Sequence, residues 1–273
     1  MRKFRLIARL DVKAPSLVKG IQLEGLRKMG DPNAFAREYY TGGIDEILYM
    51  DIVASLYGRN SLLDIVGRTT EDVFIPITVG GGLRSVEDVQ AALAAGADKV
   101  AINTAAIKDK RLISDVSSRF GSQCTVLSIE AKRRQGGSGW EAFYDNGREH
   151  SGLDVVDWAK EGEALGAGEI LLTSVDKEGL KQGMDEELIC AVCDAVSIPV
   201  VASGGCASAR HAVAAADRGA SGVAVAGPLH SKTTPVPHLK PDILTPGGLV
   251  APTKYPPSTM DGRTCEACNA LSK

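Results

Sequence analysis

The sequence predicts a (βα)8 barrel, in which eight parallel strands alternate with helices and close into a ring. Short β-branched runs alternate with helical patterns from about residue 5 to residue 230. Such alternation is typical of a parallel sheet that is buried on both faces. There is also an internal repeat, because the run IPITVGGGL that begins at Ile75 returns as IPVVASGGC at Ile198, 123 positions later.

The same offset of 123 positions relates two further pairs of segments. The tripeptide EIL at 46–48 returns at 169–171, and GADKVAIN at 96–103 returns as GASGVAVA at 219–226. An internal repeat dictates architecture. Eight units in two fourfold halves close most simply as a barrel with twofold internal symmetry. An open, doubly wound sheet would also alternate strands and helices, but it would not explain a repeat of half the chain.

Strands and helices are predicted from composition and from their end signals. Asp31 and Pro32 supply an N-cap and a first-turn proline for one helix. Ser85 and Asp88 form a capping-box pattern that opens another helix, which Gly96 ends. The eight predicted strands are residues 6–12, 46–52, 75–79, 99–103, 125–130, 169–174, 200–203 and 222–226.

Three segments do not follow the simple alternation. Residues 13–30 form a long connection that we expect to act as a lid over the catalytic face. Residues 131–152 contain Asn146-Gly147, a hairpin turn signal. Eight of the twelve prolines fall in residues 228–273, and we therefore predict a barrel over residues 1–230 and an irregular, proline-rich tail over residues 231–273.

Composition excludes several classes of protein. The chain has 273 residues, 44% of them hydrophobic, and a net charge of −3, which gives no reason to expect nucleic acid or a membrane as partner. No apolar run reaches the roughly 18 residues that a membrane span needs. The first residues read as a strand and not as a signal peptide, because Arg5 and Arg9 interrupt them. Six cysteines without a signal peptide predict a cytoplasmic location.

We expect neither a metal nor another cofactor. Two CxxC pairs, at residues 190–193 and 265–268, are the residues that would make a zinc site. The first pair lies in a helical pattern, however, and the second lies in the predicted tail.

Glycine-rich turns follow the third and the seventh predicted strands, and they are repeat partners. Small residues between a strand and a helix leave backbone N–H groups free to bind an anion. The turns after strands seven and eight are the usual phosphate site of such barrels. Two sites on opposite sides of one barrel mouth imply a substrate with a phosphate at each end. The predicted phosphate-binding residues are Gly81, Gly82, Asn103, Thr104, Ser203, Gly204, Gly205, Ala226 and Gly227.

Carboxylates also end strands on this face. Asp11 ends the first strand and Glu130 ends the fifth, so the two are repeat partners on opposite walls. A pair placed in this way suits general acid–base catalysis on a substrate between them. Further substrate contacts are predicted for Asp51, Asp176, Glu178 and Gly179.

Four charged residues lie at strand starts, at the opposite end of the barrel: Arg5, Glu46, Lys99 and Glu169. Packed aliphatic side chains normally fill the interior of such a barrel. Two charges of each sign can form a neutral arrangement, called the charged ring below. From spacing alone, the simpler interpretation is an ionic layer on the underside of the barrel.

Seven motifs over residues 5–230 resemble one family, the cyclase subunits of imidazole glycerol phosphate synthase. They are LDVK at 10–13, GDP at 30–32, VGGGLRSVEDV at 79–89, GADKVAIN at 96–103, FGSQC at 120–124, GAGEILLTSVDKEG at 166–179 and IPVVASGG at 198–205. The resemblance implies a (βα)8 barrel with two phosphate sites. It also implies a lyase of histidine biosynthesis that takes ammonia from a glutaminase subunit, its partner in a heterodimer. The implied reaction converts a bis-phosphorylated aminoimidazole ribonucleotide into imidazole glycerol phosphate and an aminoimidazole carboxamide ribotide.

The resemblance also implies roles for single residues. Asp11 falls on the catalytic aspartate after the first strand, and Lys19 falls on a lysine of a mobile loop. Asp98 falls on an aspartate of the face that docks the glutaminase. The four residues of the charged ring correspond to the gate of the family's ammonia channel. The resemblance therefore favours a role as a gate over a purely ionic layer.

Three residues depart from the family pattern. Glu130 and Glu178 stand where the family has aspartates, and Arg9 stands where it has a cysteine. Arg9 is expected to pair with Glu130. These departures keep two alternatives open: a paralogue that delivers ammonia to a nucleotide sugar or another acceptor in surface polysaccharide synthesis, and a non-catalytic partner that activates a glutaminase. A sugar-phosphate isomerase of the same barrel group also fits Asp11, but the charged ring favours the cyclase.

Overall fold

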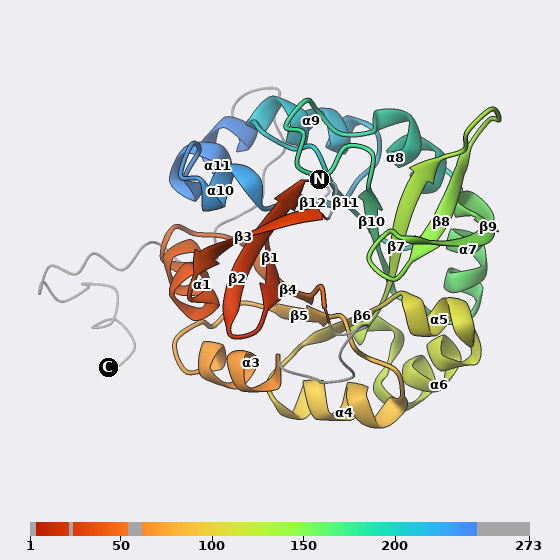
Figure 1. The fold of residues 1–273 in the computed structure, drawn as a ribbon, viewed down its shortest axis with the longest axis horizontal. Helices are drawn as coiled ribbons and strands as arrows, with labels where there is room; N and C mark the ends of the chain where they lie inside the picture. Colours follow the sequence, from red (N-terminus) through yellow and green to blue (C-terminus); the bar gives the residue numbers. More distant parts are fainter. Residues whose placement is uncertain (1–3, 22–23, 54–61, 245–273) are drawn as a thin grey trace, which may run out of the picture.

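A computed structural model of the chain describes residues 4–21, 24–53 and 62–244. Eight parallel strands form a closed barrel (Figure 1), because β1 pairs with both β4 and β12 and the ring is completed where β10 pairs with β7. The predicted fold class is therefore confirmed. The barrel strands are β1 (Arg5–Lys13), β4 (Glu46–Asp51), β5 (Ile77–Gly80), β6 (Lys99–Ile102), β7 (Thr125–Arg133), β10 (Glu169–Ser174), β11 (Val200–Ser203) and β12 (Gly222–Val225).

Helices surround the barrel (Figure 1), and two predicted helix starts are confirmed. The side chain of Asp31 accepts a hydrogen bond from the N–H of Asn33, and that of Ser85 accepts one from the N–H of Asp88. In the described part of the chain, no helix has both the length and the apolar composition to cross a membrane. The outer helices are α1 (Pro32–Thr41), α3 (Leu63–Thr70), α4 (Val86–Ala94), α6 (Arg111–Phe120), α7 (Val155–Ala164), α8 (Glu186–Cys193), α9 (Ala209–Asp217) and α11 (Val236–Leu244); shorter helices are α5 (Thr104–Lys108), α10 (Gly227–His230) and the 3-10 turn η1 (Ser122–Cys124).

Strand residues alternate between two apolar cores. Along β1, Leu6, Ala8 and Leu10 belong to the outer core between the strands and the helices, whereas Ile7 belongs to the core inside the barrel. This alternation follows from the two-residue period of a strand. The inner core includes an apolar layer across the barrel, made of Ile7, Leu48, Val126, Leu171 and Val201. The side chains of the odd-numbered residues of β1 therefore point into the barrel.

A two-stranded antiparallel ribbon extends the first strand of each half of the barrel. The segment predicted as a lid loop forms β2 (Ser16–Ile21) and β3 (Glu24–Gly30), which continue from the end of β1. In the second half, β8 (Trp140–Tyr144) and β9 (Glu149–Asp154) continue from the end of β7. The predicted hairpin turn is confirmed, since Asn146 and Gly147 adopt positive φ angles of 60° and 73° between these strands. The internal repeat thus extends to the ribbons.

Helix α11 lies within the segment that was predicted to be irregular, and that prediction is wrong for residues 236–244. Val236 and Leu239 are buried in the outer core. The ammonium group of Lys240 is also buried, and it donates to the carbonyl oxygen of Gly43 and to Asp45, each at 2.7 Å. The helix therefore takes the eighth outer position of the barrel. Residues 245–273, with Cys265 and Cys268, lie outside the described residues.

Two of the prolines that argued against this helix sit where a helix tolerates them. Pro237 lies in the first turn, where its missing N–H would have no partner within the helix. Pro235 precedes the helix, and its carbonyl oxygen accepts the N–H of Leu239 at 3.0 Å. Proline density is therefore a poor guide here, because its effect depends on position within the turn.

Leu239→Ala should lower the free energy of unfolding by about 2–5 kcal/mol, since it removes a buried side chain and leaves a cavity. His238→Ala is the matched control, because His238 is exposed on the same helix, and a surface change of this kind stays within about 0.5 kcal/mol. Urea unfolding of both variants measures the difference. Equal stabilities would mean that α11 contributes nothing to the barrel.

Candidate active site

Two cavities open at the carboxyl ends of the strands, the mouth of the barrel. The first cavity, of about 640 Å³, lies at the ends of β11 and β12 beside the β2–β3 ribbon. The second cavity, of about 540 Å³, lies at the ends of β4, β5 and β6 beside the turn between β8 and β9. Ser203, Gly204, Gly205, Ala226 and Gly227 line the first cavity. Gly81, Gly82, Asn103 and Thr104 line the second.

The structure therefore brings each predicted set of turn residues together in a cavity of its own. Two of the turns need glycine for steric reasons. Gly81 has a φ of +88°, and a Cβ there would lie 2.2 Å from the carbonyl oxygen of Asp51. Gly205 has a φ of +84°, and a Cβ there would lie 2.1 Å from the carbonyl oxygen of Gly183. The backbone thus passes close to its neighbours at both turns, so only glycine fits there without a shift of the turn.

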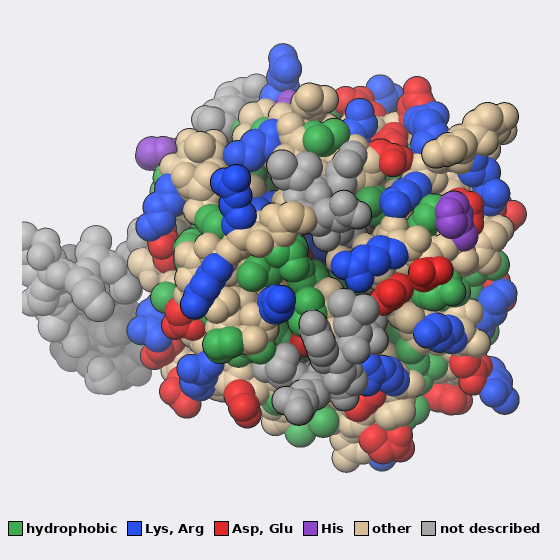
Figure 2. Space-filling model, in the orientation of Figure 1, with side chains coloured by type: hydrophobic (Ala, Val, Ile, Leu, Met, Phe, Trp, Pro, Cys, Tyr) green, Lys and Arg blue, Asp and Glu red, His purple; other side chains and the backbone are tan. Residues whose placement is uncertain are grey.

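The side chains of the two cavities differ strongly in charge. Cations dominate the first cavity, whose charged lining residues are Arg9, Lys19, Arg27 and Lys181 against Glu178. Carboxylates dominate the second, whose lining residues include Arg84 and Lys108 against Asp51, Asp109, Glu130, Asp145 and Glu149. Figure 2 shows Lys and Arg side chains gathered around the middle of this face. The repeat has conserved the backbone turns while the charges have diverged.

Arg27 and Lys181 were missed by the sequence analysis. Arg27 lies on β3, in a segment expected to be a loop without a defined side-chain direction. Lys181 adopts a φ of +60°. Its side chain packs over Gly227, since its Cε lies 3.3 Å from the position that a Cβ of Gly227 would occupy. Neither residue belongs to the repeat, and no spacing rule pointed to them.

Lys19 and Glu178 form an ion pair at the edge of the first cavity. The Lys19 ammonium lies 2.5 Å from the Glu178 carboxylate, and both side chains are largely buried. The pair joins β2 to the segment after β10. Gly179 lines the same cavity. The structure thus brings Lys19, Glu178 and Gly179 together beside the glycine turn after β11.

Arg9 contacts Asp11 and not Glu130, so the predicted Arg9–Glu130 pair is wrong. The Nε of Arg9 donates to Asp11 at 2.8 Å. The same guanidinium donates from Nη1 to Thr173 at 3.2 Å and to Ser203 at 3.1 Å. Arg9 and Asp11 are two positions apart on one strand, so both side chains point into the barrel and meet. Glu130 instead accepts the N–H of Gly147 at 2.7 Å.

The two carboxyl groups at the mouth therefore have different electrostatic surroundings. Burial disfavours ionisation of Asp11, but the charges of Arg9 and Lys19 outweigh it and lower the pKa of Asp11. Burial raises the pKa of Glu130 to about 7, because the hydrogen bond from Gly147 and the charge of Arg9 offset only part of its desolvation. At neutral pH Asp11 is an anion, whereas Glu130, with a pKa of about 7, is present in both protonation states.

Asp51 and Asp176 have different surroundings. Asp51 lines the second cavity, and its side chain accepts the N–H of Val53 at 3.0 Å. Asp176 accepts the N–H of Arg133 at 2.8 Å, so it holds the end of β7 and lies outside the residues that line either cavity. The structure does not support the predicted substrate contact of Asp176. The residue lies two positions beyond the end of β10, and its side chain turns towards the neighbouring strand β7.

His230 lines the first cavity and was not expected there. Its Nδ1 lies 2.6 Å from the hydroxyl of Tyr39. Burial lowers the pKa of His230 to about 4, so the ring is neutral at physiological pH. Among the described residues, no group of three or more His, Cys, Asp or Glu side chains is arranged to hold a metal ion.

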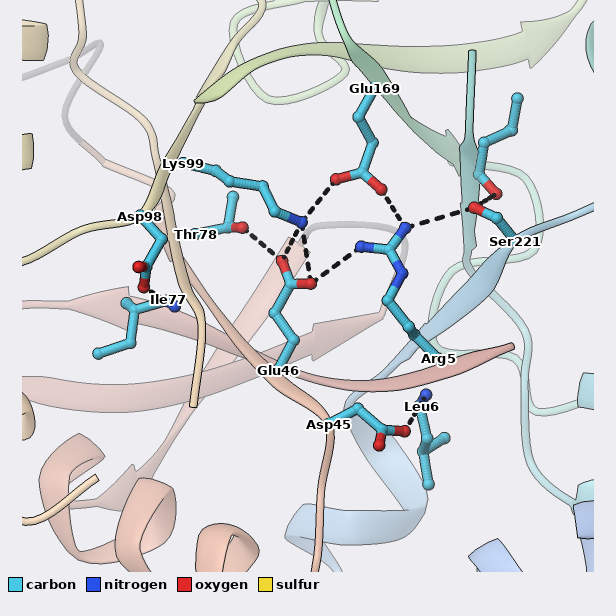
Figure 3. Close-up of polar contacts among 11 residues, drawn as sticks. Arg5, Leu6, Asp45, Glu46, Ile77, Thr78, Asp98, Lys99, Glu169 and Ser221 are labelled. Carbon is cyan, nitrogen blue, oxygen red and sulfur yellow. Dashed lines mark hydrogen bonds and ion pairs between the residues drawn. The ribbon is translucent and has the colours of Figure 1, made fainter. Parts of the chain in front are cut away.

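The charged ring closes the opposite end of the barrel, as Figure 3 shows. Arg5 contacts Glu46 at 3.0 Å and also contacts Glu169. Lys99 contacts Glu46 at 2.9 Å and Glu169 at 2.8 Å. Each charge therefore has two partners of opposite sign. Burial opposes ionisation of Glu169, but its hydrogen bond from Arg5 and the nearby positive charges lower its pKa.

Neighbours of the charged ring complete this face. Thr78, which the sequence analysis missed, donates to Glu46 at 2.6 Å. Ser221 accepts a hydrogen bond from Arg5 at 3.3 Å. Asp98 is exposed beside the ring, and its side chain accepts the N–H of Ile77 at 2.8 Å (Figure 3). The exposed carboxylate lies where a partner that approaches this face would meet it.

The closed barrel and its mouth define the class of the protein as a (βα)8-barrel enzyme with its site at the carboxyl ends of the strands. Comparison with known proteins is more specific. Residues 5–235 match the family described as histidine biosynthesis protein. The chain belongs to the HisF family, the cyclase subunits of imidazole glycerol phosphate synthase, which are lyases of histidine biosynthesis.

Three relatives illustrate this membership, each named imidazole glycerol phosphate synthase subunit HisF. The Legionella pneumophila protein is 64% identical over 205 residues, which cover 75% of this chain and 96% of the relative. The Myxococcus xanthus protein is 49% identical over 237 residues, or 86% and 93% of the two chains. The Mycobacteroides abscessus protein is 46% identical over 241 residues, or 86% and 94%.

Gly81→Ala should abolish phosphate binding at the second cavity and keep it at the first. The new Cβ would clash with the carbonyl oxygen of Asp51 and would force the turn to shift. Titration calorimetry with inorganic phosphate should then find one site, whereas two sites are expected in the unmodified protein. Gly136→Ala is the matched control, because Gly136 also has a positive φ, of +70°, but open space around it. Two sites in Gly81→Ala would contradict this assignment.

Proposed function

We propose that the chain combines ammonia with a bis-phosphorylated aminoimidazole ribonucleotide and releases imidazole glycerol phosphate and an aminoimidazole carboxamide ribotide. The observation that carries this proposal is the pair of glycine-turn cavities at one mouth, with a charged ring at the other end of the same barrel. Ammonia would enter through the ring and meet the substrate at the mouth. The name of the relatives supports the reaction, and the geometry supports the route.

The two cavities fit a long substrate with a phosphate at each end. Gly204 and Gly205 would hold one phosphate, and Gly81 and Gly82 would hold the other. Asp11 and Glu130 stand on opposite walls between them. The reacting part of the substrate would therefore lie across the barrel axis, within reach of both carboxyl groups.

The interior of the barrel supports a path for a very small molecule. The charged ring borders a cavity of about 10 Å³, lined by Ile7, Leu48 and Val126 among others. That volume is close to the minimum for one water-sized molecule, and ammonia is of similar size. Glu46, Thr78 and Glu169 line this cavity on the side of the ring. The apolar layer beyond them offers no partner to an ammonium ion, so passage through that layer favours neutral ammonia. The ring itself would have to open, because its ion pairs close the end of the barrel.

We further propose that a glutaminase subunit binds the face that carries the charged ring. This face exposes Asp98 beside Lys99, and it is the end of the barrel farthest from the two cavities. Ammonia released there would enter the barrel without mixing with the solvent. The partner would also supply the contacts that shift Arg5 or Lys99 and open the ring.

Turnover of the bis-phosphorylated ribonucleotide with ammonium chloride tests the reaction directly. The purified chain should release both products in equal amounts, and the rate should rise with the concentration of free ammonia. Turnover of a nucleotide sugar instead would favour the surface-polysaccharide alternative. Binding and activation of a glutaminase without any turnover would favour the non-catalytic alternative.

Lys99→Ala should uncouple the use of glutamine from the use of free ammonia. The change leaves Glu46 and Glu169 buried with only Arg5 as cation, and unpaired buried charge is costly. Glutamine-dependent synthesis by the complex should fall while synthesis from ammonium salts is retained. Lys110→Ala is the control, since Lys110 pairs with Glu161 on the outer surface and such pairs contribute little. Equal losses with both nitrogen sources would contradict the proposed channel.

A further inference from the structure

Arg9 is a charged residue of the barrel interior that belongs neither to the charged ring nor to the two carboxyl groups of the mouth. It lies on β1 between Ile7 of the apolar layer and Asp11 of the mouth, so it separates the two. Its guanidinium is buried, at 3% exposure, and a buried cation needs partners. Arg9 donates hydrogen bonds to Asp11, Thr173 and Ser203, which lie on three different barrel strands, β1, β10 and β11.

These hydrogen bonds fix the guanidinium in place. Its planar fork binds Asp11 through Nε and the hydroxyl oxygens of β10 and β11 through Nη1, so rotation would break contacts on both sides. A charge-assisted hydrogen bond to a carboxylate is about twice as strong as a neutral one. Only one oxygen of Asp11, Oδ1, takes part. Asp11 is therefore held as an oriented anion.

Glu130 has a different environment on the opposite wall. Its hydrogen bond comes from the backbone N–H of Gly147, and among the described residues it has no ion pair. The charged groups that face it are Arg9 from β1, Lys132 from β7 and Asp145 from the turn after β8. Asp51, Lys108 and Glu149 line the same cavity. Arg84 and Asp109 line it as well. The charges of both signs are nearly balanced, so burial is the main influence that favours the protonated group.

We propose that Arg9 is a positioning residue that keeps Asp11 a fixed anion, so that Glu130 alone carries the proton of the acid–base cycle. The inference rests on the proposed cyclase reaction. The ammonia nitrogen condenses with a carbonyl carbon of the substrate, whose oxygen leaves as water with two of the ammonia hydrogens. As the same nitrogen then forms its second C–N bond, it gives a proton to the Glu130 carboxylate. As the old C–N bond breaks, the departing nitrogen takes that proton, so Glu130 returns to its first state. Asp11 stabilises the positive charge that develops on the attacking nitrogen before its proton is transferred.

The charges around Asp11 agree with this division. Arg9 from β1, Lys19 from β2 and the neutral ring of His230 from α10 face it. Protonation of Asp11 would leave the buried guanidinium without its carboxylate. The pKa of Arg9 is raised, because the charges of Asp11 and Glu178 outweigh its burial, so Arg9 does not release its own proton either. The pKa of Glu130, about 7, is the one suited to exchange near neutral pH.

Infrared difference spectroscopy of the protein without substrate tests where the proton resides. The C=O band of a protonated carboxyl group should disappear as the pH rises, with a midpoint near 7. Glu130→Gln should remove this titration, and Asp11→Asn should retain it. The proposal would be overturned if Glu130→Gln retained the pH titration of this band, or if a folded Asp11→Asn variant lost it.

Arg9 is tested by two substitutions of similar length. Arg9→Met removes the cation, so Asp11 should become protonated and a second carboxyl band should appear at neutral pH. The double variant Arg9→Met/Asp11→Asn should lack this second band. Arg9→Lys keeps the positive charge and should therefore suppress the second band, although lysine lacks the planar guanidinium group of arginine. A single band in folded Arg9→Met would overturn the role of Arg9. Should Arg9→Met fail to fold, the comparison of Glu130→Gln with Asp11→Asn still decides which group holds the proton.

Kinetics separate this inference from the proposed function. Glu130→Gln should lower kcat by about 10²- to 10⁴-fold, the usual contribution of an acid–base group, with little change in KM. Asp11→Asn should lower kcat but keep a pH profile with its midpoint near 7. An unmodified protein that shows the Glu130 titration yet no turnover would contradict the proposed substrate. A pH profile that survives Glu130→Gln would contradict the division of roles.

Discussion

The two-residue period of a strand in a closed barrel is the constraint on which the rest of this structure depends. It forces every second side chain of β1 into the interior, which stacks Arg5, Ile7, Arg9 and Asp11 from one end of the barrel to the other. Neighbouring strands contribute matching layers. The barrel therefore contains, in order, a charged ring, an apolar layer, a buried guanidinium and the carboxyl groups of the mouth. A register slip of one residue on β1 would place all four side chains among the outer helices.

Burial determines what each layer can do. In the charged ring every charge has two partners of opposite sign, so the layer is neutral and closed. At Arg9 the same requirement selects Asp11 as partner and fixes its ionised state. Glu130 has no ion pair within the described ranges of the chain, and its carboxyl group takes up a proton near neutral pH. One physical rule, that buried charge must be compensated, thus produces a closed ring of ion pairs at one end and two carboxyl groups of different pKa at the other.

The internal repeat has been kept in the backbone and lost in the charges. Both halves carry a ribbon on their first strand, and both carry a glycine turn that a side chain would obstruct. Yet Arg27 and Lys181 make one cavity cationic, while Asp109, Asp145 and Glu149 make the other anionic. Equal turns can hold equal phosphates, but the unequal surroundings favour a single orientation of an asymmetric substrate.

The sequence by itself determined the barrel, its twofold repeat, the glycine turns and the members of the charged ring, because these depend on periodicity and spacing along the chain. It did not determine which charged groups contact each other. Arg9 was expected to pair with Glu130, but it pairs with Asp11 on its own strand, and Glu130 accepts a hydrogen bond from Gly147 in the turn between β8 and β9. Asp176 follows β10, yet its side chain bonds to the end of β7 and does not line a cavity. Helix α11 forms despite its prolines, because Val236 and Leu239 find a buried site between elements distant in sequence. Side-chain partners and burial are properties of the closed barrel, and only the tertiary structure decides them.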